Sequence, residues 1–447
     1  MRKVGIAALA VAAASAALAA AASSRAPAVA VPRVAAKPAK GDGAMLAVVP
    51  GARGPVLGRL DKRALWIARR SPRLRIFNPV ASWTYSPDGT QLALATEYEG
   101  GTVPVASIQW IDPDSLTRAA RTKLGDGSPA GIAWSSERVN LVLRTWCCPG
   151  SFEVVGVSAR THKVISRRRF ERNVIDVRRA GSALVVLTSP ELGIGAASLL
   201  VVDPDGSTRS VVLDRIGAGF DVPDESGSEA SMRQSIPGLA VDAAGGRAFV
   251  VPGSGAIAEV ALAPLGVAYH AVAEPVSLLG RVHGWLEPAA EAKGLNGPSR
   301  EAHWLGGGIL AVTGTDETAA RVGDELRVMR TPIGLRLVDT SSWASKLIDR
   351  GADDVHLDGG LLLATGSRLA LGEAQDGMGL AVYGFDGVRR VAALQGEAAY
   401  VNLSFGGRAY LSLTTSRQNA VVDLATGAVG ARRAPMPDLL LSPSVAR

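Results

Sequence analysis

Cysteine and histidine are scarce in this chain. Its 447 residues include two Cys, which are adjacent at Cys147 and Cys148, and five His. A zinc site needs His and Cys ligands at short spacings, and no His lies two to four residues from another His or from a Cys. The sequence therefore predicts no metal site, and no pattern in it points to a cofactor.

The motifs of several enzyme classes are missing as well. No G-x-S-x-G nucleophile elbow occurs. DPDS at Asp112 and DPDG at Asp203 lack the further acids of a calcium loop, so we expect ordinary turns there. LGGGIL at Leu305 precedes a strand rather than a helix, which argues against a phosphate-binding loop. Asp353, Asp354 and Asp358 are candidates for a carboxylate cluster, but no spacing identifies a glycosidase.

The basic charge is concentrated at the N-terminus. The formal net charge is +7, yet residues 1–42 hold six Lys and Arg against one acidic residue, Asp42. The rest of the chain has 42 basic and 40 acidic residues. A nucleic-acid interface normally shows a basic stripe on the folded domain. Nucleic acid is therefore not an expected partner.

The N-terminal residues have the pattern of a targeting segment. Three residues, Met1 to Lys3, carry two positive charges and precede an apolar, Ala-rich run that ends at Ala22. We expect residues 1–22 to be a signal peptide, 23–42 an Ala/Pro-rich linker and 43–447 the folded domain. The protein is then secreted or extracytoplasmic. An uncleaved membrane anchor is the alternative, because about 20 apolar residues can span a bilayer.

One pattern recurs along the folded domain. A short aliphatic strand, a turn with Gly or Asp and a second aliphatic strand follow one another, as in WTYSPDGTQLALA from Trp83 and GLAVDAAGGRAFVV from Gly238. Two more strand-like runs follow each hairpin, and no long helical periodicity is present. Copies recur about every 40 to 65 residues, a period typical of four-stranded propeller blades. The copies begin at Trp83, Gly131, Val174, Gly238, His303, Val355 and Tyr400, with a half copy at Asp438.

The two ends of the domain complement each other. Residues 44–78 offer MLAVV, PVLGRLD and RLRIF without a first strand, whereas DLLLSP from Asp438 is a first strand with nothing after it. Pairing them would close the sheet edge that each leaves open. We therefore predict an all-β protein: a single β-propeller of four-stranded antiparallel blades. Eight blades closed in this way are favoured, and seven are the alternative.

The hairpin SPDGTQLALA, from Ser86 to Ala95, resembles the repeat of bacterial WD40-like, or TolB-type, propeller proteins. The resemblance covers the chain from about residue 44 as a repeat pattern, with one full SPDG copy. It implies a propeller that serves as a binding platform, and no single activity. Quinoprotein alcohol dehydrogenases are similar in blade number and in an adjacent Cys pair. Their repeated Trp docking motif and calcium ligands are missing here, which makes a quinoprotein-like dehydrogenase the weaker alternative.

Three long excursions interrupt the regular pattern, at residues 217–235, 274–300 and 315–332. In a four-stranded blade, connections between blades and turns between strands two and three lie on one face of the disc. All three excursions fall in such positions. The turn with Cys147 and Cys148 does too. We therefore expect one elaborated face that carries function.

The excursion 274–300 supplies most of the predicted binding residues. Its apolar side chains and the segment between Glu287 and Gly294, with Pro near the start and Gly at the end, predict a short helix packed on the propeller. The acidic, Ser/Gly-rich excursion 217–235 is predicted to be either disordered or a solvated flap. The predicted binding residues are Trp285, Glu287, Lys293, Arg300 and Glu225.

Adjacent cysteines in an exported protein favour oxidation. We predict a vicinal disulfide between Cys147 and Cys148, which would stiffen a turn on the elaborated face. Two free thiols, or cross-links to another chain, are the alternatives.

Two functions follow from these observations. The first is an exported, non-enzymatic propeller, expected to be monomeric, that binds a protein, peptide or glycan on the elaborated face. The second is a propeller hydrolase or lyase, in which acids such as Asp221, Asp224, Glu225 or Asp354 converge at the central channel. Three or more carboxylates that meet at the channel mouth would favour the enzyme. The membrane is a partner only if the N-terminal segment is uncleaved.

Overall fold

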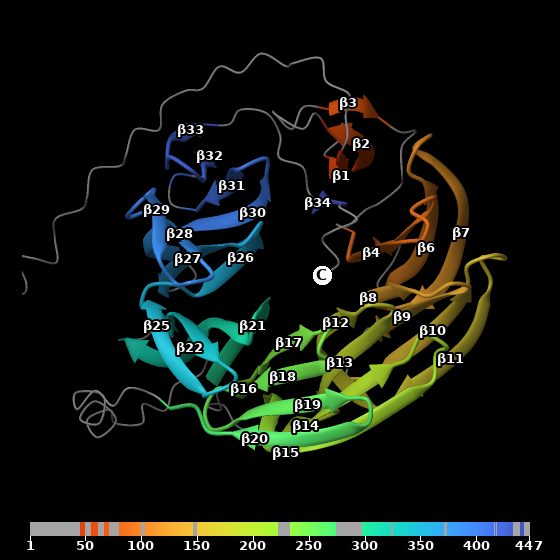
Figure 1. Cartoon of the computed structure of the whole chain (residues 1–447), viewed down its shortest axis with the longest axis horizontal. Coiled ribbons are helices and arrows are strands. Elements are labelled where there is room, and N and C mark those ends of the chain that lie inside the picture. Colours follow the sequence, from red (N-terminus) through yellow and green to blue (C-terminus); the bar gives the residue numbers. More distant parts are fainter. Residues whose placement is uncertain are drawn as a thin grey trace, which may run out of the picture.

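The structure is a computed structural model, in which the described residues form a ring of antiparallel sheets (Figure 1). The residues described are 45–49, 55–60, 67–70, 80–99, 103–145, 150–221, 233–273, 297–322, 325–370, 373–414, 416, 418–431 and 439–441.

The sheets correspond to eight blades, which confirms the predicted all-β propeller. Six sheets have four or five strands, and a nine-stranded sheet contains two further blades. We number the blades in chain order. Blade 1 holds β1–β3 and β34, blade 2 β4–β7, blade 3 β8–β11, blade 4 β12–β16, blade 5 β17–β20, blade 6 β21–β25, blade 7 β26–β29 and blade 8 β30–β33.

Each blade contributes one strand to each of four concentric layers. The innermost strands are β4 (Ser82–Tyr85), β8 (Ser128–Trp134), β12 (Arg172–Ala180), β17 (Gly238–Asp242), β21 (Gly297–Gly306), β26 (Asp354–Asp358), β30 (Ala399–Phe405) and β34 (Leu439–Leu440). The second strands are β1 (Met45–Val49), β5 (Leu92–Glu99), β9 (Arg138–Arg144), β13 (Ala183–Pro190), β18 (Arg247–Val251), β22 (Ile309–Val322), β27 (Leu361–Ala370) and β31 (Arg408–Leu413).

The outer half of each blade is built the same way. The third strands are β2 (Val56–Leu60), β6 (Pro104–Asp112), β10 (Phe152–Ser158), β14 (Gly193–Val202), β19 (Ile257–Leu262), β24 (Leu335–Asp339), β28 (Glu373–Gly384) and β32 (Gln418–Asp423). The outermost strands are β3 (Ile67–Arg70), β7 (Thr117–Asp126), β11 (Val164–Phe170), β15 (Thr208–Asp221), β20 (Leu265–His270), β25 (Ala344–Asp349), β29 (Arg389–Ala393) and β33 (Val429–Ala431). Two additional strands are β16 (Arg233–Ser235) and β23 (Glu325–Pro332).

The core of the protein lies between the blades. Alternating side chains of each strand point to opposite faces of its sheet, so each blade packs against a neighbour on both sides. Among the described residues, eight clusters of buried aliphatic and aromatic side chains occupy the eight interfaces between consecutive blades. The interface between blades 8 and 1 is one of these, with Ala47 and Val49 against Leu403 and Tyr410. The packing therefore runs around the whole ring.

The ring is closed by the pairing that the sequence predicted. Ala47 and Val48 of β1 pair with Leu440 and Leu439 of β34, antiparallel. The Tyr85 hydroxyl donates a hydrogen bond to the Leu441 carbonyl, 2.8 Å away, which links the closing strand to blade 2. The inner edge of β1 is thus covered by a strand from the other end of the domain.

The SPDG turn shows why the repeat hairpin needs its residues. The Gly89 amide donates to the Ser86 carbonyl at 2.8 Å, and Gly89 has a φ of 73°, which favours glycine. The Asp88 carboxylate accepts hydrogen bonds from the Ser86 hydroxyl and the Thr90 amide. The polar groups at the tip of the hairpin between β4 and β5 therefore find their hydrogen-bond partners within the turn itself.

Blades 6 and 7 are joined by paired hairpins. β22 and β23 pair from Thr315 and Pro332 out to Val322 and Glu325, and Met329 and Arg330 of β23 pair with the end of β27. The excursion 315–332 was predicted as a loop, and this was wrong over the described residues. The segment extends β22 and adds β23 as its antiparallel partner beyond the disc. The backbone donors and acceptors of the two strands are therefore paired with each other.

A second strand prediction was displaced. RLRIF, residues 73–77, was predicted as the third strand of the N-terminal fragment, but that strand is β3, Ile67–Arg70. A short connection from β2 is enough for an antiparallel neighbour, so the chain uses the nearer run. Residues 71–79 lie outside the described part, as does the proposed signal peptide and linker. In the described part, no helix is long and apolar enough to span a membrane.

Candidate functional site

The two faces of the disc differ in what they carry. We call the face with the connections between blades, including the flanks Asp221 and Arg233 of one connection, the loop face. The opposite face, with the hairpin tip Ser86–Gly89 and equivalent tips, is the hairpin face. Inner strands run from the loop face to the hairpin face, so their first residues lie near the loop face.

A cavity of about 320 Å³ lies on the loop face, between the ends of the inner strands of blades 6 to 8 and the connection from blade 4 to blade 5. It brings together residues from the base of each of the three excursions, as the single elaborated face requires. The lining residues are Gln234 and Ile236 from the first, Ser299, Arg300 and Glu301 from the second, Gly314, Thr315, Glu317 and Arg330 from the third, and Asp353, Asp354 and Tyr400 from the next two blades.

The bases of the first two excursions are held together by backbone contacts. The Ile236 amide donates to the Pro298 carbonyl at 2.9 Å, and the Arg300 amide donates to the Ile236 carbonyl at 2.8 Å. These two hydrogen bonds hold the start of β21 next to the connection from blade 4 to blade 5. The wall of the cavity is therefore fixed by main-chain pairing.

The carboxyl groups of Glu301 and Asp354 are hydrogen-bonded to each other in this cavity. Burial raises the pKa of Asp354 to about 7, and the negative charge of Glu301 and the shared hydrogen bond add to the rise. Burial also works to raise the pKa of Glu301, but hydrogen bonding and charge from His303, together with Arg178 and Asp354, outweigh it and lower that pKa. Asp354 therefore holds the proton and Glu301 the charge.

The His303 ring orients this pair. Its Nε2 atom lies 3.0 Å from Oε1 of Glu301, on the same face of β21 because the two residues are two apart. Arg178 of β12 is the second positive group near Glu301, and its guanidinium is held by Asp176 at 2.9 Å. Burial raises the pKa of Asp176 too. The inner strands of blades 4, 6 and 7 thus contribute to one network of charges.

Asp353 is the second cavity carboxyl with an elevated pKa. Burial raises the pKa of Asp353 to about 6, although the Ser367 amide donates to its Oδ2 at 3.1 Å and Arg330 lies near enough to lower it. Both neighbouring aspartates at the start of β26 therefore change charge near neutral pH. Such perturbed groups in a cavity are typical of functional sites.

Glu317 is the most completely paired acid of the cavity. Its side chain is 5% exposed, and its Oε1 lies 2.7 Å from Nη2 and 2.8 Å from Nε of Arg330. The Gln234 amide donates to the other oxygen at 3.4 Å. A buried carboxylate needs this compensation, so the Glu317 and Arg330 pair serves as a fixed part of the wall.

Arg300 was predicted as a binding residue, and its side chain lines the cavity. The guanidinium is, however, only 7% exposed and already has several partners. It lies 2.7 Å from Asp316 and donates to the carbonyls of Thr315 and Gly253 at 2.8 and 2.9 Å. Arg300 therefore ties the base of two excursions together, and a direct contact with a ligand stays a prediction.

The described part of the structure places none of the other predicted site residues in the cavity. Asp221, an acid of the enzyme alternative, is exposed at the end of β15, where it pairs in register with Arg233. No group of His, Cys, Asp and Glu among the described residues is arranged to hold a metal ion. The remaining predicted residues lie outside the described residues, namely Asp224, Glu225, Trp285, Glu287, Lys293 and the Cys147–Cys148 pair.

Three charged residues of the cavity were missed at the sequence level. Glu301, Glu317 and Arg330 belong to ordinary strand runs, and nothing in their spacing separates them from surface charge. Glu301 and His303 are two residues apart, which is the one local signal that could have marked a shared face of an inner strand. Asp354 had been named, but without the partner that shifts its pKa.

Comparisons with solved structures give distant matches over most of the chain. BamB from Moraxella catarrhalis matches with a TM-score of 0.44 and 11% identity, over 91% of this chain and 98% of that one. Dihydro-heme d1 dehydrogenase NirN in complex with DHE matches with a TM-score of 0.49 and 14% identity, over 92% and 76%. The periplasmic gluconolactonase PpgL of Pseudomonas aeruginosa matches with a TM-score of 0.40 and 15% identity, over 89% and 98%.

These matches do not indicate an activity, because identities are low and the matched proteins differ in what their names describe. No protein-family model matches the chain. No curated protein sequence matches it either.

Proposed function

We propose that the protein is an exported, non-enzymatic propeller that binds a cationic segment of a protein or peptide on its loop face. The observation that carries the proposal is that the described bases of all three excursions meet at one carboxylate-lined cavity. Rigid scaffolds commonly present binding residues at the base of long excursions. The excursions would supply contacts around the rim, with Trp285, Glu287, Lys293 and Glu225 as the predicted ones.

The charge of the cavity argues for a cationic ligand. Four carboxyl groups and two guanidinium groups line it. Both guanidinium groups already have acidic partners, Arg300 in Asp316 and Arg330 in Glu317. Glu301, Asp353 and Asp354 are left without an Arg or Lys ion pair among the described residues. A Lys or Arg side chain of a partner would complete the set.

A titration tests this proposal directly. Fluorescein-labelled octalysine is the probe, octaglutamate is the opposite-charge control, and binding is followed by fluorescence anisotropy at pH 8 and low salt. We expect saturable binding of octalysine alone, with roughly threefold to tenfold weaker binding for Asp353→Asn, as for loss of one rim or pocket charge.

The matched control removes one negative charge elsewhere. Asp126 is exposed at the end of β7, on the outer edge of blade 2 and on the same face. Asp126→Asn should bind octalysine like the original chain. Equal weakening by both substitutions would mean that octalysine senses only overall charge, and the proposal would fail.

Four carboxyl groups line this loop-face cavity, which meets the criterion given above for an enzyme. The Glu301 and Asp354 pair therefore favours a second candidate, a hydrolase. A protonated carboxyl beside an ionised one near neutral pH supplies an acid and a base in one site. Chromogenic p-nitrophenyl glycosides and esters are suitable probes between pH 4 and 8. Turnover that is lost in Glu301→Gln and retained in Asp126→Asn would favour this candidate, whereas no turnover of either substrate class would count against it.

Export has its own test. The proposed signal peptide ends at residue 22, so protein collected outside the cytoplasm should have an N-terminus near Ser23. Mass spectrometry of the intact protein gives this directly. A full-length chain retained in the membrane fraction would instead support the uncleaved anchor.

A further inference from the structure

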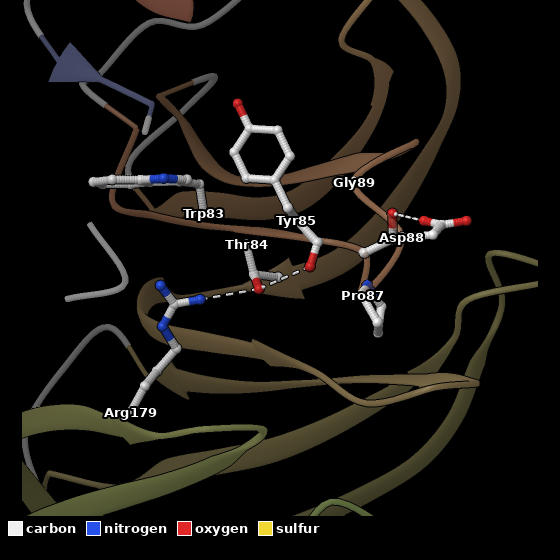
Figure 2. Close-up of a pocket in the computed structure, with 8 residues that line it drawn as sticks. Trp83, Thr84, Tyr85, Pro87, Asp88, Gly89 and Arg179 are labelled. Atoms are coloured by element: carbon white, nitrogen blue, oxygen red, sulfur yellow. Dashed lines mark hydrogen bonds between the residues drawn. The ribbon is translucent and has the colours of Figure 1, made fainter. Parts of the chain in front are cut away.

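A second cavity, of about 390 Å³, lies at the hairpin-face end of the inner strands of blades 2 and 4, away from the acidic cavity. It differs from the first in the state of its arginine, which has no acidic partner in the described part of the chain, and two aromatic residues stand in its wall (Figure 2). Its lining residues are Trp83, Thr84, Tyr85, Ser86, Pro87, Asp88, Gly89 and Arg179.

Arg179, near the end of β12, reaches past blade 3 to blade 2. Its Nη1 donates to the Thr84 hydroxyl at 3.0 Å, the contact drawn in Figure 2. Its Nε is buried and has no hydrogen-bond partner. Burial lowers the pKa of Arg179, with no carboxylate nearby to counter the effect. The Nε and Nη2 edge of the guanidinium, the edge that matches a carboxylate, is therefore left without an acidic partner.

Trp83 provides a second unused donor in the same wall. Its indole Nε1 is buried and has no hydrogen-bond partner. Buried donors without partners cost free energy and are rare in proteins. Both residues line one cavity, and one of the two donors belongs to a cation. A bound anionic oxygen that reached these donors would satisfy them.

The acid in this lining does not serve Arg179. Asp88 accepts hydrogen bonds from the Ser86 hydroxyl at 2.5 Å and from the Thr90 hydroxyl at 2.9 Å. The Ser86 hydrogen bond is the main reason that the pKa of Asp88 is lowered. Figure 2 shows its carboxylate at the opposite end of the lining residues from Arg179. The positive charge in the cavity is thus uncompensated among the described residues.

From these observations we infer that this cavity is a binding site for a small aromatic carboxylate. The carboxylate would pair with the free edge of Arg179, as a single positive charge suits a monoanion. The indole of Trp83 offers an apolar face on which a planar ring can stack. The volume, about 390 Å³, is within the range of small-molecule sites. This site lies on the opposite face from the proposed peptide site and does not depend on it.

Calorimetric titration of the full chain tests the inference, with benzoate as the probe and benzamide as its uncharged counterpart. We expect saturable benzoate binding at low salt and roughly tenfold weaker binding of benzamide, because the charge-assisted pair is lost. Arg179→Met should abolish benzoate binding, and Arg179→Lys should retain part of it, since Lys keeps the charge without the planar fork.

Two controls separate this role from a structural one. Arg160→Met removes an exposed positive charge from the turn after β10, on the same face, and should leave benzoate binding unchanged. The melting temperature of Arg179→Met should equal or exceed that of the original chain, because an uncompensated, partly buried cation is removed.

Three results would overturn the inference. The first is no saturable benzoate binding up to 10 mM, roughly the weak end of specific ligand affinities. The second is unchanged binding in Arg179→Met. The third is acetate or inorganic phosphate binding as tightly as benzoate, which would leave no role for the Trp83 face.

Discussion

The carboxyl groups of Glu301 and Asp354 are hydrogen-bonded to each other across the boundary between blades 6 and 7. One residue is on β21 and the other begins β26, so the pair also links two innermost strands that are not adjacent in any ladder. Because Asp354 changes charge near neutral pH, we expect both the free energy of unfolding and the affinity of the cavity for cations to depend on pH.

The first prediction concerns stability and pH. The pKa of Asp354 is about 7 in the folded chain against 3.8 for the free group. The folded state therefore holds a proton that the unfolded state releases, so this contribution is complete below about pH 4 and is lost as pH rises to 7. Asp354→Asn cannot titrate, and we expect it to be more stable than the original chain at pH 8 by about 2 kcal/mol.

Urea unfolding at pH 5 and pH 8 measures this difference. The exposed variant Asp126→Asn should show the same pH dependence as the original chain. A loss of stability in Asp354→Asn at pH 8 would show that the ionised pair, rather than the protonated one, stabilises the fold.

The second prediction concerns the binding of octalysine and pH. Asp353 and Asp354, with pKa values of about 6 and about 7, gain negative charge between pH 5 and pH 8. A cationic probe should bind roughly tenfold more tightly at pH 8 than at pH 5, equivalent to about 1.4 kcal/mol. In the double variant Asp353→Asn, Asp354→Asn, measured by the same anisotropy titration, this pH dependence should disappear.

The third prediction tests the close approach of blades 3 and 4. A Cβ added at Gly131 of β8 would lie 2.4 Å from Cγ1 of Val177 on β12. Gly131→Ala should therefore lower the free energy of unfolding by about 1–3 kcal/mol, by overpacking. The effect should shrink when Val177→Ala is also present, because the clashing methyl group is gone.

Gly266→Ala on the outermost strand β20 is the matched control. A Cβ there meets nothing within 4 Å, so urea unfolding should show a change within about 0.5 kcal/mol. If Gly131→Ala lowers the free energy of unfolding equally in the original chain and in Val177→Ala, the contact with Val177 is not the cause of the loss.

The fourth prediction tests ring closure. The side chain of Leu441 is fully buried in the cluster between blades 1 and 2. Leu441→Ala should cost about 2–5 kcal/mol, as for other buried leucines. Leu192→Ala, at a residue that is 75% exposed, should have little effect on the melting curve. Similar curves for both variants would mean that the closing segment contributes little to stability.

Sequence reasoning was sufficient for the fold because the blade pattern is local. The hairpin from Trp83 to Ala95 shows its turn residues and its alternating strands within one short stretch. The complementary fragments at the two ends were enough to predict the closing pair of β1 and β34. Both predictions concern backbone pairing between strands. The residues of each strand and of its turn are enough to predict such pairing.

The sites were predicted less well because they depend on contacts between blades. Nothing in the sequence near Glu301 shows that Asp354 will lie opposite it, since that depends on the relative height of two separate inner strands. Trp83 packs against the apolar cluster between blades 1 and 2, as a first-strand aromatic residue in a repeat hairpin is expected to do. Its unused indole donor became visible only once Arg179, from two blades away, was placed beside it.

The closing strand also has a consequence for how the protein is made. β34 is the last of the described strands to leave the ribosome, whereas its partner β1 is the first. At ordinary rates of elongation, β1 waits on the order of half a minute or longer for a neighbour on its inner side. Blades 2 to 8 consist of strands that precede β34 in the chain, whereas blade 1 is complete only with β34. Until β34 is made, β1 therefore exposes an unpaired inner edge, which is a template for pairing with another chain.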